Sequence, residues 1–421
     1  MLKRSYFTYA LLLGVSISLF SPQHVLADEN GERIIRLLDN DNLNDDVKGI
    51  IINLIKKGAD VNSVDADGYT PLLTAASLDQ VYIMEALIKA GADLNTANKG
   101  FTPLMLASRS GNHHAALLLI NKGAKIHLQN IYKETALHSA AQGALEDIVI
   151  MLINKGAKIN IKDDEGMTPL LYTTKNWLAD ASLLLIKKGA DTNITDKEGN
   201  TPLLYAAKSS MPKVAIKLID KGADVNVRDI DGKTSLFFAM EYTLPNLFSK
   251  LISKNAEIDL KTSNGVTPIF FAAKEGLNKS LIRLLERDVD INEENEFEKT
   301  PLIVAVENKK TKTATLLIKE GANINASDRD KNSALIYATA LSLSNTAIEL
   351  INKGANVNEQ NVYRVTPLMN AAEKGLIKVV KLLIKKGANI RTRDIHGENA
   401  IDYATHKRKN HTIEKLLKDA L

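Results

Sequence analysis

The amino-acid sequence predicts an all-α solenoid, and two observations carry this prediction. One stretch, Thr201–Lys233, reads as two short helices followed by an extended turn, and it is too short to bury its own apolar face. The same pattern recurs along most of the 421 residues at a period of about 33. Stacked copies of such a unit bury a continuous core, so the chain needs no single globular core.

The unit Thr201–Lys233 contains a signal for each of its elements. Pro202 suits the first turn of a helix, where its missing N–H is not needed. A second helix opens at Pro212 and ends at Gly222, which can adopt the left-handed conformation that closes helices. Residues Asp229–Gly232 have the composition of a hairpin turn. The second helix is amphipathic, with Val214, Ala215, Leu218 and Ile219 on one face and Lys213, Lys217, Asp220 and Lys221 on the other.

The copies of this unit are spaced by 33 residues at every step except the first, which is 32. Asn255 and Asp288 stand where the other units have the helix-closing glycine, and both residue types visit the left-handed region more readily than most. A second glycine, two residues before the unit start, is replaced in four units by Lys133, Glu298, Lys331 and Arg364, which should strain the turn. The units start at Thr70, Thr102, Thr135, Thr168, Thr201, Thr234, Thr267, Thr300, Ser333, Thr366 and Asn399.

Most units begin with TPL, and residues 135–141, TALHSAA, are similar to the T-P-L-H-x-A-A run of ankyrin repeats apart from the missing proline. The chain therefore resembles an ankyrin repeat protein from about residue 34 to residue 421. The resemblance implies about ten full repeats of helix, turn, helix and β-hairpin loop, with capping repeats at both ends. It also implies that partner proteins meet the concave face, which the hairpin tips and first helices form.

Four segments follow from these patterns: a signal peptide at 1–27, N-terminal capping helices at 28–62, the repeat array at 63–396 and a C-terminal capping repeat at 397–421. The signal peptide is predicted from basic Lys3 and Arg4, an apolar stretch at 10–20 and the small residue Ala27 at the cleavage point. The apolar stretch is shorter than the roughly 20 residues that span a membrane, which favours cleavage over retention as an anchor. We therefore expect an exported protein, periplasmic or secreted, without membrane insertion after cleavage. Its Lys-, Ile- and Asn-rich composition suggests a bacterial source.

Composition excludes several classes of function. The formal net charge of +4 falls to +2 when Lys3 and Arg4 are removed, because residues 1–27 contain no acidic residue. This balance is poorly suited to binding nucleic acid, which requires a concentrated basic face. The chain contains no Cys, so it has neither disulfides nor thiolate metal ligands.

No motif for catalysis or cofactor binding appears. The acidic turns DADG, DDEG, DKEG and DIDG lack the twelfth-position Glu of an EF-hand. The GKT at 232–234 has Val227 where a phosphate-binding loop requires Gly. The eight His residues do not have metal-ligand spacing. We predict no enzymatic activity, no cofactor, no metal and no small-molecule substrate.

Candidate protein-binding residues are those that place apolar bulk where solvent is expected. Two of them, Tyr242 and Leu341, occupy the exposed flank of first helices. Exposed aromatic side chains are common binding hot spots, but these residues could instead pack against neighbouring hairpins, and both interpretations stay open. The candidates at the hairpin tips are Ile131, Tyr132, Ile230, Phe297, Val362 and Tyr363.

Two further patterns concern the scaffold. An aromatic residue four positions after the unit start recurs in six units, and we predict that it packs between successive first helices. The units that start at 234 and 267 lack the helix-closing glycine, and the first of them also has Ser235 in place of proline. We predict that residues 234–332 form the least stable part of the array. The recurring aromatic residues are Tyr172, Tyr205, Phe238, Phe271, Tyr337 and Tyr403.

Together these patterns predict a monomeric, non-catalytic scaffold that binds a protein partner through its concave face. Two alternatives stay open. The chain could be a secreted effector that engages a host protein, or a structural spacer or tether in the cell envelope.

Overall fold

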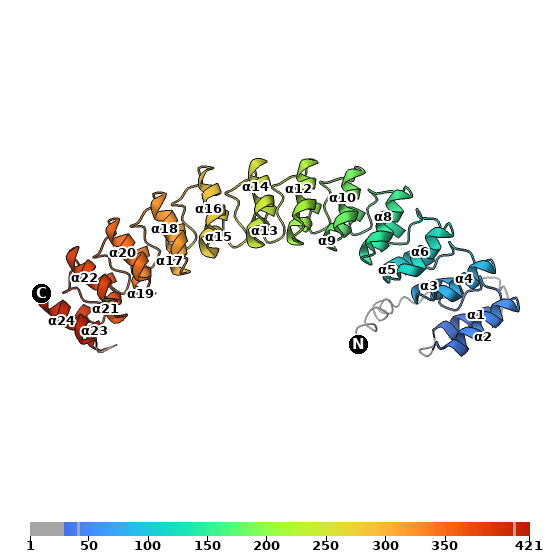
Figure 1. The fold of residues 1–421 in the computed structure, drawn as a ribbon, viewed down its shortest axis with the longest axis horizontal. Coiled ribbons are helices and arrows are strands. Elements are labelled where there is room, and N and C mark those ends of the chain that lie inside the picture. The colour runs from blue at the N-terminus through green and yellow to red at the C-terminus, as the bar shows by residue number, and fades with distance from the viewer. Residues whose placement is uncertain (1–28, 40–42, 407–409) are drawn as a thin grey trace, which may run out of the picture. The chain divides into compact units, whose positions relative to one another are not determined.

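The computed structural model describes residues 29–39, 43–406 and 410–421, and this part of the chain is built from 24 helices (Figure 1). The predicted signal peptide at 1–27 lies outside the described residues. The chain divides into two compact units, one ending at Ile131 and the other running from Tyr132 to Leu421. None of the described helices is long and apolar enough to cross a membrane.

Unit 1 contains three helix pairs, in which the first helices pack on one another and the second helices do the same. The pairs are α1 (Glu29–Leu38) with α2 (Asp45–Lys56), α3 (Pro71–Ser77) with α4 (Val81–Lys89), and α5 (Pro103–Arg109) with α6 (His113–Asn121).

Unit 2 contains nine helix pairs, and within it the odd-numbered first helices form one layer and the even-numbered second helices another (Figure 1). The first helices are α7 (Ala136–Gln142), α9 (Pro169–Lys175), α11 (Pro202–Lys208), α13 (Ser235–Glu241), α15 (Pro268–Glu275), α17 (Pro301–Glu307), α19 (Ala334–Ala340), α21 (Pro367–Glu373) and α23 (Ala400–His406). The second helices are α8 (Glu146–Asn154), α10 (Ala179–Lys187), α12 (Pro212–Asp220), α14 (Pro245–Ser253), α16 (Asn278–Leu285), α18 (Thr311–Lys319), α20 (Ser344–Asn352), α22 (Ile377–Lys385) and α24 (His411–Asp419).

The residue that starts a unit caps the first helix in most units, although the described structure has no such side-chain bond at Thr234 and Thr267. In α11 the Thr201 Oγ1 accepts the N–H of Leu204 at 3.2 Å, and Pro202 occupies the first helical position as predicted. A capping side chain of this kind contributes about 1 kcal/mol to helix stability. The recurring Thr-Pro pair is therefore a helix start signal, present in seven of the eleven units.

The predicted left-handed positions are confirmed. Asn255 and Asp288, which replace the helix-closing glycine, both have φ of 57°. The residues that replace the hairpin glycine share this conformation, with φ of 62° at Lys133, 59° at Glu298, 58° at Lys331 and 60° at Arg364. The repeat geometry therefore imposes a backbone conformation that costs a non-glycine residue about 1–2 kcal/mol.

The loops after the second helices are tight turns without regular strands in the described part of the chain. They contain three isolated β-bridges, Asn98 with Phe101, Arg228 with Thr234 and Ser327 with Ser333. Each loop is closed mainly by its own turn and by bonds to the next loop. The β-hairpin of the sequence prediction is thus reduced to its turn.

A ladder of asparagine side chains joins these loops in unit 2. Asn193 Oδ1 accepts the N–H of Asp224 at 2.8 Å, and its Nδ2 donates to the Gly222 carbonyl at 3.0 Å. Asp259 occupies the equivalent position without such a bond among the described residues, and a hollow of about 490 Å³ opens there. The rungs of the ladder are Asn160, Asn193, Asn226, Asn292, Asn325 and Asn358.

The core of each unit is made of small and branched residues between the helix layers. Leu203, Ala206 and Ala207 of α11 and Leu218 of α12 are completely buried. Burial of a leucine side chain contributes about 1.5–3 kcal/mol. Alanine at the contacts between successive first helices allows their close approach, which explains why so few aromatic residues are needed.

Candidate functional site

The tips of the loops in unit 2 form a row that is held together by backbone hydrogen bonds; we call it the hairpin row. The Tyr132 carbonyl accepts the N–H of Asp164 at 3.0 Å, and the Phe297 carbonyl accepts the N–H of Arg329 at 3.1 Å. Further along, the Tyr363 carbonyl accepts the N–H of Ile395 at 3.1 Å. Each of these bonds joins one tip to the next, so the side chains at these tips are presented from an ordered backbone.

The apolar side chains predicted at the tips are exposed. Their exposed fractions range from 45% to 83%, which shows that they are not buried against the neighbouring hairpins. In unit 1 the exposed tip residue is Ile131, whose N–H is bound to the Lys99 carbonyl at 3.3 Å. The exposed tip residues of unit 2 are Tyr132, Ile230, Phe297, Val362 and Tyr363.

The two candidates on first helices lie elsewhere. Tyr242 and Leu341 follow the last residues of α13 and α19, at the helix ends that face the inter-helix turn. Tyr242 stacks on Phe238 with ring centroids 6.2 Å apart, and Leu341 is only partly exposed. Tyr242, at the equivalent repeat position, is 44% exposed, and neither residue lies among the loop tips that form the hairpin row.

Nine large apolar residues of the described chain are exposed without having been predicted candidates, and two of them stand out. Ile395 lies at a tip beside Tyr363 and is half-exposed. Its position, four residues before Asn399, is the one occupied by Ile131 and Ile230, so the repeat register could have revealed it. Trp177 is 68% exposed in the turn between α9 and α10, with a left-handed φ of 60°.

The aromatic row on the first helices is largely buried, as its predicted packing role requires, and it also forms a polar contact that the sequence did not suggest. The Tyr205 hydroxyl donates to Asp196 Oδ2 at 2.6 Å, while Asp196 Oδ1 accepts the N–H groups of Glu198 and Asn200. We call this arrangement the Tyr–Asp clamp, because it ties a first helix to the tip of its own loop. The same clamp joins Tyr172 to Asp163, Tyr337 to Asp328 and Tyr403 to Asp394.

The clamp also affects protonation. Burial, followed by the hydrogen bond to the aspartate, raises the pKa of Tyr205, Tyr337 and Tyr403 well above the usual value. At Asp394, burial raises the pKa of the carboxyl, but hydrogen bonds from Tyr403 and from backbone amides outweigh burial and lower it. The clamp therefore favours a neutral tyrosine and an ionised aspartate at neutral pH.

His138 makes a different clamp at the start of α7. Its Nδ1 lies 3.2 Å from the Thr135 backbone N and 2.8 Å from the Thr135 Oγ1, while Nε2 lies 3.0 Å from the Ile161 carbonyl oxygen. Neutral imidazole with the proton on Nε2 satisfies all three contacts. Burial lowers the pKa of His138, in keeping with a neutral ring in a structural role.

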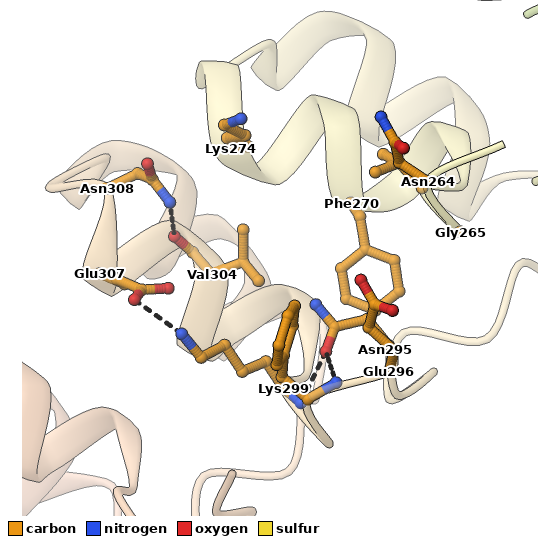
Figure 2. A pocket seen from close by; sticks show the side chains of 12 residues that line it. Asn264, Gly265, Phe270, Lys274, Asn295, Glu296, Lys299, Val304, Glu307 and Asn308 are labelled. Atoms are coloured by element: carbon orange, nitrogen blue, oxygen red, sulfur yellow. Dashed lines mark hydrogen bonds and ion pairs between the residues drawn. The ribbon is translucent and has the colours of Figure 1, made fainter. Parts of the chain in front are cut away.

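One hollow of about 400 Å³ opens on the first helices beside the hairpin row (Figure 2). It lies between the loops around Gly265 and Asn295, with Phe270 of α15 and Val304 of α17 at its base. Figure 2 shows the Phe270 ring pointing from α15 toward Asn295 and Lys299. Phe297, one of the predicted binding residues, belongs to the lining.

The described part of the chain contains no group of three or more His, Asp or Glu residues placed to hold a metal ion. The hollow is lined by amide, carboxylate and ammonium groups together with apolar side chains. Its lining includes no histidine, serine or threonine.

Comparison with known proteins identifies the family. A model described as ankyrin repeats (3 copies) matches residues 43–130, 118–196, 137–229, 176–262 and 269–361, and one described as ankyrin repeats (many copies) matches residues 350–404. The chain is 37% identical over 83 residues to the ankyrin repeat and SAM domain-containing protein 6 of Rattus norvegicus, an alignment that covers 18% of this chain and 9% of that protein. It is 36% identical over 100 residues to the putative ankyrin repeat protein FPV031 of Fowlpox virus (strain NVSL), covering 23% of this chain and 27% of the relative.

The chain thus spans less than a third of the length of either relative. The family models, in contrast, follow the repeat array through most of its length and agree with the helix pairs, the capping threonines and the loop turns. Ankyrin repeats are in general protein–protein interaction modules, typically without catalytic activity of their own. This chain belongs to the ankyrin repeat family.

Proposed function

We propose that this protein is a non-catalytic, monomeric scaffold that binds a partner protein on the hairpin row and the adjoining first helices. The observation that carries the proposal is the row of exposed apolar side chains on hydrogen-bonded loop tips. Because the backbone of the row is already ordered, binding immobilises few additional groups, and this lowers the entropic cost of association.

The chemistry of the tips fits a protein partner. Aromatic residues such as Tyr132, Phe297 and Tyr363 bring large contact areas with few rotatable bonds. Charged residues lie beside them, and surface pairs such as Lys197 with Glu165, 2.9 Å apart, show that both signs are present along the row. Apolar anchors supply most of the affinity in such interfaces, and rim charges set specificity and the association rate.

A pull-down with the full chain tests the proposal. We compare the unchanged protein with a triple variant, Tyr132→Ala, Phe297→Ala and Tyr363→Ala. The matched control replaces three exposed apolar residues away from the row, Tyr82→Ala, Trp177→Ala and Ile282→Ala. Circular dichroism verifies that all three proteins are folded.

We expect the unchanged protein and the control to retain the same partner protein and the row variant to lose it. A partner retained equally by all three proteins would move the binding site off the hairpin row. Retention of no protein by any of them would remove the scaffold proposal and favour a structural spacer or tether.

We also propose that the protein is exported, on the basis of the signal-peptide pattern in residues 1–27. Cell fractionation with mass determination of the N-terminus tests this. A mature chain that begins after Ala27 in the periplasm or medium supports export, and delivery into a host cell would identify an effector. An uncleaved chain in the membrane fraction supports a tether, and an uncleaved chain in the cytoplasm overturns export.

A further inference from the structure

We propose that the hollow beside Phe297 receives one bulky apolar side chain of a partner protein, from a segment that carries Lys or Arg close to this anchor. This inference rests on the proposed function and names the chemistry of the partner. It depends on three observations: a missing aromatic ring, an exposed phenylalanine on a fixed loop, and uncommitted carboxylates at the rim.

The hollow exists because one repeat departs from the pattern of its neighbours. The position four residues after the unit start is aromatic in the flanking units, Phe271 and Tyr337, but it is Val304 here. The partner of the clamp is changed too, since Asn295 stands where the other clamps have Asp. A side chain without a ring leaves open the space that tyrosine fills elsewhere, and a hollow of about 400 Å³ results.

The walls of the hollow are apolar at the base. Val304 and Phe270 are nearly buried, and Val266 lines the side. Lys274 and Lys299 also line the hollow, together with the polar residues Asn264, Asn295, Glu296, Glu307 and Asn308. Such a base favours an apolar side chain and disfavours a charged one, which would lose its hydration there.

Phe297 stands at the rim on a backbone that is already fixed. Its N–H donates to Asn295 Oδ1 at 2.9 Å, and its carbonyl accepts the N–H of Arg329 at 3.1 Å. The ring is nevertheless 52% exposed. An apolar side chain that enters the hollow would cover this ring, so both surfaces become buried in one event.

The loop that carries Phe297 concentrates negative charge beside the hollow. Residues 286–298 contain seven carboxylates and one guanidinium, whereas the whole chain carries +4. Glu293 is held by Thr267 at 2.9 Å, and Glu298 lies 3.7 Å from the Arg329 guanidinium. Glu294 and Glu296 are exposed and form no ion pair with the described residues, so their charge is available to a partner.

Among the described residues no cation forms an ion pair with these two carboxylates, although the Arg329 guanidinium donates to the Glu296 backbone carbonyl at 2.5 Å. Lys299 Nζ is engaged by Glu307 Oε1 at 2.7 Å, and Lys274 lies on the α15 side. The complementary partner therefore carries its apolar anchor in the hollow and its Lys or Arg residues toward the loop tip. A second copy of this chain is the competing occupant, because α22 also combines an apolar side chain, Ile377, with the nearby basic residues Lys378 and Lys381.

The experiment selects peptides from a phage-displayed random 12-residue library on the immobilised full chain and measures their affinity by fluorescence anisotropy. Val304→Tyr refills the hollow with a residue that the same position accepts in neighbouring repeats. Asn370→Tyr makes the matched change at the same position of another unit. Glu294→Lys with Glu296→Lys reverses the rim charge, and Asp180→Lys on α10 serves as its control.

We expect enrichment of peptides with one aromatic or large aliphatic residue within three positions of two or more Lys or Arg. Val304→Tyr should raise the Kd by about 30-fold, as for loss of a hot-spot contact. The double charge reversal should raise it by about tenfold at low salt. The two control variants should bind as the unchanged protein does. If Val304→Tyr does not fold, Phe297→Ala, at an exposed position, replaces it with the same expectation.

Peptides that bind Val304→Tyr and Phe297→Ala as tightly as the unchanged chain overturn the inference and leave the scaffold proposal standing. Failure to enrich any basic–apolar peptide also overturns it. Concentration-dependent dimers in sedimentation velocity that disappear in Val304→Tyr would assign the hollow to a second copy. Loss of the scaffold proposal is recognised separately, by a pull-down in which no protein is retained.

Discussion

Different repeats of this protein use different side chains to fasten a first helix to a loop. His138 accepts from Thr135 at one ring nitrogen and donates to the Ile161 carbonyl at the other, so it joins the start of α7 to the following loop. Tyr205 joins the middle of α11 to Asp196 of its own loop. Both contacts place a neutral hydrogen-bonding group in a buried position, and both therefore depend on its protonation state.

We expect His138 to make the protein less stable in mild acid. Burial lowers the pKa of the His138 imidazole in the folded state below its unfolded value of about 6.5. The contribution of His138 to the free energy of unfolding is therefore complete above about pH 6.5 and falls as the pH decreases below it. The decline is at most about 1.4 kcal/mol per pH unit. Urea unfolding between pH 7.5 and 5.5 measures it; His138→Gln should remove this component and His127→Gln at an exposed position should not. Equal pH dependence in all three proteins would exclude the role of His138.

We expect Tyr205→Phe to loosen the loop without unfolding the helices. The variant keeps the ring but removes a hydrogen bond to a carboxylate, a loss of about 1–2 kcal/mol. Amide hydrogen exchange should accelerate at Glu198 and Asn200, whose N–H groups are held by the same aspartate. Tyr82→Phe on an exposed tyrosine is the control, and unchanged exchange in Tyr205→Phe would show that the clamp adds no stability.

At the scale of the element, hydrogen bonds between neighbouring loops hold the loops in place. The asparagine ladder supplies one side-chain-to-backbone bond per rung, and the loop tips add backbone bonds. Asp259 lacks the N–H donor of asparagine and lies near Asp288 and Asp290 along the lining of the same hollow. Like charges that line one hollow destabilise the folded state.

We expect Asp259→Asn to stabilise unit 2 by about 0.5–1.5 kcal/mol, the contribution of a restored hydrogen bond. Asparagine can accept the N–H of Asp290 and donate to the Asp288 carbonyl, as Asn193 does with Asp224 and Gly222. Thermal unfolding monitored by circular dichroism gives the change. Asn193→Asp is the reciprocal control and should lose a similar amount; a destabilised Asp259→Asn would refute the ladder as a source of stability.

At the scale of the whole molecule, the irregularities of the array gather in one segment. Both hollows described above, the missing rung at Asp259 and the two replaced helix-closing glycines fall within or beside residues 234–332. Repeat stability is close to a sum of local and nearest-neighbour contributions, so these losses accumulate in one place. The same segment carries the acidic loop and Phe297, so the repeats that we predict to be least stable lie beside the proposed contact for a partner.

We expect hydrogen exchange to be fastest, among the helices of unit 2, in α13 to α16. Opening of a repeat with weakened neighbours requires less free energy than opening of the regular repeats on either side. Mass spectrometry of peptic peptides provides the measurement, with α9 to α12 as the internal reference. Uniform protection along unit 2 would contradict a soft segment, and binding of a basic–apolar peptide should slow exchange in α15 and α17 selectively.

The sequence by itself determined the repeat length, the capping threonines and the left-handed backbone at Asn255 and Asp288. These features depend on residues close together in the chain, so a period of 33 residues makes them visible. Only the tertiary structure decided the Tyr–Asp clamps, the asparagine ladder, the partial burial of Leu341 and the hollow at Val304. Each of these features depends on which side chains meet across a loop or between repeats, and on whether a ring or an amide fills the space between them. The local sequence pattern does not encode such contacts.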